Sequence, residues 1–232
     1  QALPPDLQDE RALLRANVLL ARGQPARAAE VLETLLPRSA AASRYARYNL
    51  GIALVRSGQE ARGRALLDAL GRETMPDEES RTLRDRANVA LGFTALGTGD
   101  FEAARNALQR VRLASSDANK ALLGFGWAAA SLKQPAKALV PWSELVGRGG
   151  PDAAVLEARI AVPYAYAELG ATGQALARYE DAIAAFEQES AAIDQAIGAI
   201  RAGKLVDGLM QRNPGEEMGW FEHGSTIVAF AP

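Results

Sequence analysis

Few residues in this sequence could carry out nucleophilic or acid–base chemistry. The chain has a single histidine, His223, and no cysteine. A nucleophile–base pair built on His223 would have no obvious partner held in place beside it. The lack of cysteine excludes thiolate metal ligands and disulfides, and one histidine cannot build the usual histidine-containing zinc sites. We therefore expect no metal centre and no catalytic residue.

Two glycine-rich stretches and two acidic pairs also have the composition of chemical sites. The stretches 97–99 (GTG) and 124–126 (GFG) are not predicted to be phosphate loops, because neither follows a strand and neither has the lysine of a P-loop. The pairs Glu78-Glu79 and Glu216-Glu217 stand in turn-like, solvent-facing contexts, which disfavours a general acid or base. The sequence therefore predicts a protein that is not an enzyme and binds no cofactor.

The composition favours packed helices and disfavours two classes of partner. Hydrophobic residues make up 48% of the 232 residues, while aromatic residues make up only 6%. Alanine is abundant, has the best helix propensity and lets helices approach closely. The 26 basic and 28 acidic residues nearly cancel, unlike the charge of proteins that bind nucleic acid or anionic membranes. No apolar run reaches the ~18 residues of a membrane span.

One pattern recurs along most of the chain. Each copy has an apolar-periodic helix, a short turn with glycine, glutamine or proline, and a second periodic helix. The copies cover residues 15–35, 48–70, 88–111, 122–145 and 162–183. They follow one another about every 34 to 41 residues, a period typical of helical repeats. Because one helix pair cannot bury its apolar face alone, such copies are expected to stack.

Small residues recur where the two helices of each copy are predicted to cross, because little side-chain bulk permits a short interaxial distance. In the first helices they are Ala16, Gly51, Gly92 and Gly126, and in the second helices Ala28, Gly63, Ala104, Ala138 and Ala175. One turn later a large residue is expected to fill the gap: Leu32, Leu67, Leu108, Trp142 or Tyr179. Left-handed C-caps are predicted at Gly58, Gly99 and Gly170. A helix start is predicted at 76–80, with Asp77 or a neighbour as its N-cap.

This pattern resembles the tetratricopeptide repeat, most clearly in YNLGIALVRSGQEARGRAL and LGFTALGTGDFEAARNAL. The resemblance covers roughly residues 10–185. The first copy departs from it at Arg15, where leucine is usual, and the fifth at Pro163. The fourth turn is 133–135 (KQP) rather than a glycine turn. The resemblance implies an all-α fold, a right-handed α-solenoid of about five helical hairpins.

The helical spacing of apolar residues continues beyond the fifth copy and predicts a long helix to about Arg212. The residues that carry this spacing are Ile183, Phe186, Ile193, Ile197, Ile200, Leu205 and Leu209. We expect the far end of this helix to extend from the stack or cap it. The predicted organisation is a repeat domain (1–185), an extended C-terminal or capping helix (186–212) and an irregular tail (213–232).

The resemblance also implies a binding groove, because first helices of this family line a concave surface. Positions one helical turn apart would point into the groove, and most of them are apolar or aromatic. They are Leu13, Asn17, Tyr48, Ile52, Val89, Phe93, Leu123, Trp127, Ile160 and Tyr164. The crossing residues already supply a core, so this stripe is available for binding. Its occupant would be a partner segment, or the chain's own C-terminal helix or tail.

A narrower possibility is recognition of a C-terminal carboxylate, which some tetratricopeptide domains grip with two asparagines and three basic residues. Asn17, Asn49 and Arg86 fall at matching positions, but Leu13 and Ala90 replace two of the basic residues. Losing two cations removes most of the charge-assisted bonding. An apolar groove is therefore favoured over this clamp.

The predicted function is a non-enzymatic scaffold or adaptor that binds another polypeptide, with no nucleic-acid partner and no membrane span. Similar bacterial repeat proteins serve envelope assemblies in secretion, pilus formation or outer-membrane biogenesis. The start without methionine favours a periplasmic or envelope location. The alternatives are a cytoplasmic chaperone-like regulator that masks an apolar segment, and the non-catalytic repeat region of a larger enzyme.

Overall fold

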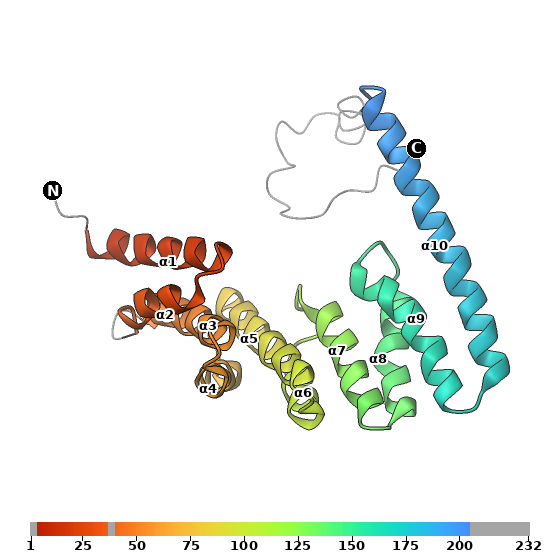
Figure 1. The fold of residues 1–232 in the computed structure, drawn as a ribbon, viewed down its shortest axis with the longest axis horizontal. Coiled ribbons are helices and arrows are strands. Elements are labelled where there is room, and N and C mark those ends of the chain that lie inside the picture. Colours follow the sequence, from red (N-terminus) through yellow and green to blue (C-terminus); the bar gives the residue numbers. More distant parts are fainter. Residues whose placement is uncertain (1–3, 37–39, 205–232) are drawn as a thin grey trace. The chain divides into compact units, whose positions relative to one another are not determined.

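The computed structural model describes residues 4–36 and 40–204, and this part of the chain contains ten α-helices and no strand. The helices form five successive hairpins, which pair α1 with α2 and so on to α9 with α10 (Figure 1). Their bounds are α1 Pro5–Ala21, α2 Pro25–Glu33, α3 Ala40–Arg56, α4 Glu60–Arg72, α5 Glu78–Gly97, α6 Phe101–Leu108, α7 Ala118–Ser131, α8 Pro135–Arg148, α9 Ala153–Glu168 and α10 Thr172–Arg201. The predicted all-α repeat fold is confirmed.

Contacts divide the chain into two units, residues 1–145 and 146–232. The first unit contains α1 to α7 and most of α8. From α1 to α7 each helix packs against the next, and the first helices α1, α3, α5 and α7 also touch one another in order. They therefore form one continuous layer. In the second unit α9 packs against α10.

The small residues at the crossings are needed because a large side chain lies directly over each of them. A Cβ added to Gly51 would lie 2.7 Å from Cγ of Leu67, and one added to Gly92 would lie 2.7 Å from Cδ2 of Leu108. Both leucines are buried, so each fills the gap that its glycine leaves. The predicted pairing of a small residue with a large one is thus confirmed in these hairpins.

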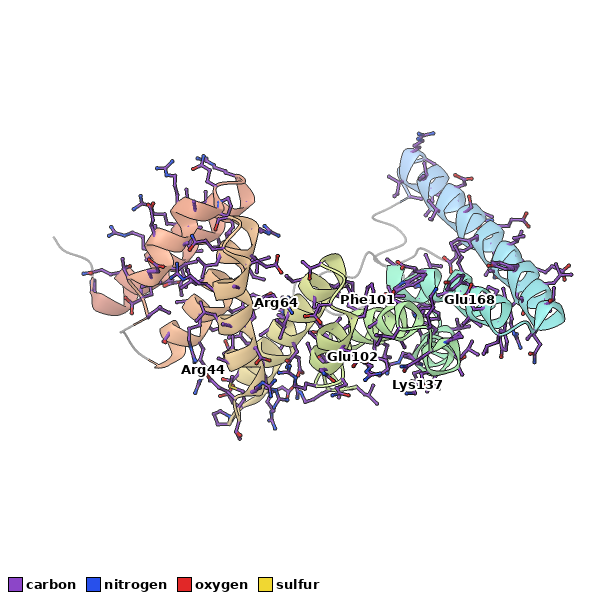
Figure 2. All side chains as sticks on the ribbon, turned by 60° about the horizontal axis from the view of Figure 1, so that its bottom comes forward. Arg44, Arg64, Phe101, Glu102, Lys137 and Glu168 are labelled. Atoms are coloured by element: carbon purple, nitrogen blue, oxygen red, sulfur yellow. The ribbon has the colours of Figure 1, made fainter. Side chains whose placement is uncertain are left out.

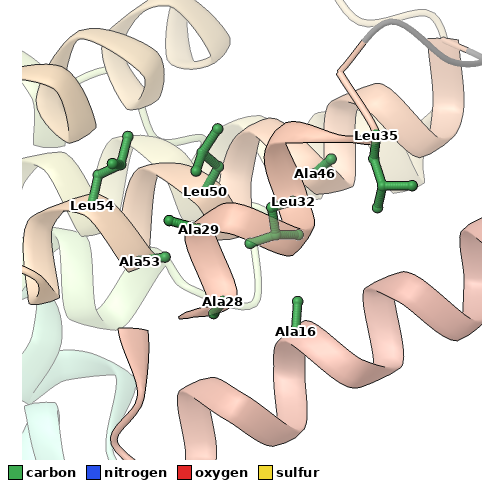
Figure 3. Close-up of a cluster of buried hydrophobic side chains, with 9 residues drawn as sticks. All are labelled: Ala16, Ala28, Ala29, Leu32, Leu35, Ala46, Leu50, Ala53 and Leu54. Carbon is green, nitrogen blue, oxygen red and sulfur yellow. The ribbon is translucent and has the colours of Figure 1, made fainter. Parts of the chain in front are cut away.

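The same arrangement begins at the N-terminal end of the first unit. Ala16 on α1 and Ala28 on α2 are fully buried where the helices meet, and Leu32 closes the gap beside them. Figure 3 shows these side chains among the leucines of α3, including Leu50 and Leu54. The first hairpin and the first helix of the second hairpin therefore share one apolar cluster.

The fifth hairpin differs from the prediction. Tyr179, expected to fill a crossing gap, is 38% exposed on α10. The first helix of this hairpin has the buried Pro163 at the crossing instead of glycine, so a glycine-sized gap is absent. The buried face of α10 is formed instead by the small residues Ala175 and Ala182.

The turns and caps follow the predicted chemistry. Gly58, Gly99 and Gly170 have φ values of 84°, 78° and 74°, as left-handed C-caps require. Asp77 is the N-cap of α5, and its carboxylate accepts a hydrogen bond of 2.7 Å from the backbone N–H of Ser80. This bond lowers the pKa of Asp77 below its ordinary value. The fourth turn, which lacks glycine, places Lys133 in the left-handed region at φ 60°.

Lys133→Gly should therefore raise the free energy of unfolding by about 1 kcal/mol, because left-handed backbone strains a residue with a Cβ. Urea denaturation followed by circular dichroism measures the change. Ala136→Gly, at an exposed helical position of α8, is the matched control and should lower stability by roughly 0.5–1 kcal/mol. A loss of stability in Lys133→Gly would show that this turn is not strained.

The helix α10 is long, as predicted, but it ends at Arg201 rather than continuing to about Arg212. Gly203, with φ 75°, lies just beyond the C-cap and stops it. The predicted domain boundary at residue 185 falls inside α10, and the predicted tail (213–232) lies outside the described residues. No helix among those described is long and apolar enough to cross a membrane.

Ion pairs tie the second helices of neighbouring hairpins together. Arg64 of α4, labelled in Figure 2, is 2.7 Å from Asp100 at the start of α6, and Arg110 is 2.9 Å from Asp68 of α4. The hydrogen bonds that Asp68 accepts from Arg72 and Arg110 outweigh its burial and lower its pKa. These contacts help to hold the stacking register on the side away from the layer of first helices.

Candidate functional site

The layer formed by α1, α3, α5 and α7 has an accessible surface, which we call the first-helix face. Side-chain bonds cross each junction in this layer. The Asn49 amide of α3 donates to the Asn17 oxygen of α1 over 3.1 Å. Arg86 of α5 is 3.4 Å from the carboxylate of Asp117 at the start of α7. Residues separated by some 30 positions in the sequence thus share one surface.

Most of the predicted groove residues of the first unit lie on the first-helix face and are at least partly accessible. Phe93 is 40% exposed, while the others range from half-buried to exposed. These others are Leu13, Asn17, Tyr48, Asn49, Ile52, Arg86, Val89 and Trp127. Leu123 is an exception, with only 7% of its surface exposed, and belongs to the core. The N-terminal half of α7 is more deeply buried than the helical spacing of its apolar residues predicts.

A hollow of about 330 Å³ opens in the first-helix face, and we call it the Tyr48 hollow. Tyr48 of α3 and Val89 and Ala90 of α5 form its apolar wall, and burial raises the pKa of the Tyr48 hydroxyl. Its polar wall is formed by Arg86, Asp117 and Lys120. The hollow can accept an apolar side chain beside a group that carries negative charge.

The polar wall of the Tyr48 hollow has two cations and one anion. Asp117 lies 3.4 Å from Arg86 and 3.5 Å from Lys120, and both basic side chains are more than half exposed. One positive charge therefore remains available to a ligand. Asp117 and Lys120 were not predicted, because nothing in the sequence marks them, and only the packing of α7 on α5 brings them to Tyr48. Lys120 provides a cation near Ala90, where the carboxylate-binding pattern lacks one.

Trp127 belongs partly to the core and partly to the surface. Its ring meets that of Trp142 edge-to-face, with centroids 4.9 Å apart and an interplanar angle of 67°. Trp142 is fully buried, and its indole N–H donates to the carbonyl of Leu123 over 3.2 Å. Truncating Trp127 would disturb this packing, so Phe93 is the better probe of binding.

The last two predicted groove residues lie in the second unit. Ile160 is exposed and Tyr164 is half-buried on α9. They lie on α9 of the second unit and do not belong to the first-helix face.

A second and larger hollow of about 1030 Å³ lies among α6, α7 and α8, and we call it the α6–α8 hollow. It is mainly apolar, and Leu113 and Val140 on its rim are 66% and 72% exposed. The repeat pattern does not predict this hollow, because it forms where α7 meets α8, the end of α6 and the segment that joins α6 to α7. It is larger than the Tyr48 hollow and more apolar.

The acidic pair at 78–79 makes contacts with neighbouring side chains. No group of three or more potential metal-ligating side chains occurs in residues 4–36 and 40–204. Glu78 pairs with Arg112, a contact that lowers its pKa, and Glu79 accepts a hydrogen bond from Tyr45. The acidic pair at 78–79 thus has a structural role, whereas Glu216-Glu217 and His223 lie outside the described residues.

Hairpins that stack in register and present one accessible layer of first helices define a helical-repeat protein of the interaction class. The sequence matches the tetratricopeptide-repeat family over residues 13–77 and 89–154, more than half of the chain. The protein therefore belongs to the tetratricopeptide-repeat family. A comparison with curated protein sequences gives no significant match.

Solved structures with the same fold include two described as MamA and one of a kinesin light chain. MamA from AMB-1 is 21% identical, with a TM-score of 0.59 over 78% of this chain and 93% of that one. MamA (41-end) from Desulfovibrio magneticus RS-1 is 17% identical, with a TM-score of 0.61 over 81% and 98%. The TPR-like repeats of a Podosopora anserina kinesin light chain are 16% identical, with a TM-score of 0.61 over 79% and 96%. At these identities the likeness establishes the fold.

Proposed function

We propose that this tetratricopeptide-repeat scaffold holds a partner polypeptide on the first-helix face, without catalysing a reaction. The observation that carries the proposal is the Tyr48 hollow, where an apolar wall stands beside the exposed cations Arg86 and Lys120. Phe93 lies one turn beyond Val89 on α5 and adds an exposed aromatic ring on the same helix face. Aromatic and arginine side chains are the residues that contribute most to protein interfaces.

The surface favours a partner of one kind of chemistry. An extended segment with an apolar side chain near an acidic side chain or a terminal carboxylate would satisfy both walls of the hollow. A neutral apolar segment would satisfy only the apolar wall. The amides of Asn17 and Asn49 lie on the neighbouring helices of the same face and can bond to the backbone of the segment.

Peptides selected from a random phage-displayed library on the full chain provide the test. Their dissociation constants are measured by fluorescence anisotropy on the wild type and on Phe93→Ala. We expect Phe93→Ala to weaken binding by about 1 to 2 kcal/mol, roughly tenfold in Kd, because an exposed aromatic anchor is lost. The selected peptides should be enriched in acidic and apolar residues.

Val140→Ala is the matched control, because it removes an exposed apolar side chain from the rim of the α6–α8 hollow. It should leave the affinity unchanged, and both variants should keep the helical content of the wild type. If Val140→Ala weakens binding while Phe93→Ala does not, the α6–α8 hollow is the binding site and the proposal fails.

The setting in an envelope assembly is a further part of the proposal. The absence of cysteine is compatible with this setting, because no thiol would be exposed to an oxidising compartment. Cell fractionation with antibodies to the native protein tests it. Recovery in the cytoplasmic fraction would favour the chaperone-like regulator instead.

A further inference from the structure

One side of α1, the first described helix, carries large apolar residues that nothing in the described chain covers. Leu7, Leu14 and Val18 are 44%, 59% and 49% exposed. At 100° per residue they fall within a narrow sector opposite Ala16, which is the buried contact of α1 with the core. They therefore form a stripe on the outer side of the helix, which we call the α1 stripe.

The last described helix, α10, has a matching but longer stripe. Its exposed apolar residues lie at steps of three or four, apart from one step of ten between Ile183 and Ile193, and steps of three and four are the spacing of helices that pair side by side. They are Leu176, Tyr179, Ile183, Ile193, Ile197 and Ile200, and we call them the α10 stripe. Ala175 and Ala182 make the contact with α9, so that contact leaves the α10 stripe uncovered.

One charged row along the α1 stripe is opposite in sign to one charged row along the α10 stripe. Arg15 and Arg22, seven residues apart and both exposed, run along one edge of the α1 stripe, and the exposed Arg11 lies within it. Glu180, Glu187 and Asp194, also at steps of seven, run along the corresponding edge of the α10 stripe, and all are exposed. Viewed from the N-terminus of each helix, the charged row lies on the same side of its stripe in both helices.

This arrangement selects a partner for the α10 stripe. Two α10 helices placed antiparallel would bring their acidic rows against each other, which repels. An α1 stripe laid antiparallel on an α10 stripe brings Arg15 and Arg22 alongside the acidic row, with equal spacing. We infer that α10 of one copy of this chain docks on α1 of a second copy, in a head-to-tail arrangement.

Repeat architecture supports the inference independently. The outer faces at the two ends of a helical-repeat stack are normally polar, because an apolar face there would associate. Here α1 and α10, the first and last described helices, have apolar stripes instead. A head-to-tail contact uses different surfaces on the two copies, so it leaves one free stripe at each end and can continue into chains. The inference does not depend on the proposed function, because neither stripe includes the Tyr48 hollow or Phe93.

Analytical ultracentrifugation of the full chain over about a hundredfold range of concentration tests this contact. We expect the average mass to rise continuously above the 24.6 kDa of one chain, without stopping at the dimer. High salt should reduce the rise, because the flanking charges are exposed and screened. A wild type that stays monomeric at every concentration would overturn the inference.

Two variants test the α1 stripe and the α10 stripe separately. Leu14→Asp blocks only the α1 stripe and Ile183→Asp only the α10 stripe, and both residues are 59% exposed, so the fold should remain intact. Each variant alone should be monomeric at concentrations where the wild type associates. Mixed together they should form a 1:1 dimer through the one intact pair of stripes, and growth should stop there.

The other arrangements predict different results. If two α10 stripes paired with each other, Leu14→Asp alone would still dimerise and Ile183→Asp would not. If the stripe of α10 were covered within its own chain, the mixture would stay monomeric. Either result contradicts the head-to-tail contact, and circular dichroism on both variants verifies that they are folded.

Discussion

Gly126→Ala is expected to lower the free energy of unfolding by about 3 kcal/mol, at the upper end of the usual cost of overpacking. The new Cβ would lie well inside contact distance of the Trp142 ring, 2.6 Å from its Cδ1 atom. Trp142 is fully buried, and its N–H is bonded to the carbonyl of Leu123. The ring therefore cannot move aside without breaking that bond or separating α7 from α8.

The effect should exceed that of the same change at Gly51, where the obstacle is the flexible side chain of Leu67 rather than a rigid ring. Gly147→Ala is the matched control on α8, because nothing lies within 4 Å of a Cβ at that position. It should leave stability unchanged or raise it by up to roughly 1 kcal/mol. Thermal and urea denaturation followed by circular dichroism measure all three. Equal stability of Gly126→Ala and Gly147→Ala would mean that the hairpin can open to accept a methyl group.

The second large effect is expected at Arg112, in the segment between α6 and α7. Its guanidinium lies 2.7 Å from Asp85, which is fully buried, and 2.9 Å from Glu78. Among the described residues, Arg112→Ala leaves Arg84, 3.5 Å away, as the remaining ion-pair partner of the buried carboxylate of Asp85. We expect a loss of about 3 kcal/mol, because removing one partner of a buried pair leaves a charge that water cannot reach.

Arg178→Ala provides the comparison for this prediction. Its pair with Asp181 has a similar distance of 2.9 Å, but both side chains are about 60% exposed. Its loss should cost less than about 0.5 kcal/mol. The double change Arg112→Ala with Asp85→Ala should recover part of the stability, because it removes the unpaired charge. Chemical denaturation at neutral pH measures these differences, and a small effect of Arg112→Ala would mean that Asp85 is solvated.

The Arg112 contact also bears on the proposed binding face. Asp117, which pairs with Arg86 and Lys120 in the Tyr48 hollow, follows Arg112 in the same connecting segment. The buried pair anchors that segment to α5 and so helps to place Asp117. A head-to-tail chain of copies would then repeat the hollow at regular intervals, and a partner with several matching segments would bind more tightly through multivalency.

Features that depend on neighbouring residues were determined by the sequence alone. Helical periodicity, the left-handed glycines at 58, 99 and 170, the Asp77 cap and the pairing of small with large residues in the first four hairpins agree with the structure. Each acts within one hairpin, where residues that touch are at most a few tens of positions apart. Repetition of one hairpin then predicts the stack.

Features that depend on how hairpins meet were decided only by the tertiary structure. Leu123 has the spacing of a groove residue but is buried, while Tyr179 has the spacing of a core residue but is exposed. Asp117 and Lys120 join Tyr48 because α7 packs on α5 and α5 on α3. A repeat pattern gives each residue a position on its own helix, but burial and charge pairing depend on the side chains that the neighbouring helices bring. That is why the fold could be predicted and the hollow could not.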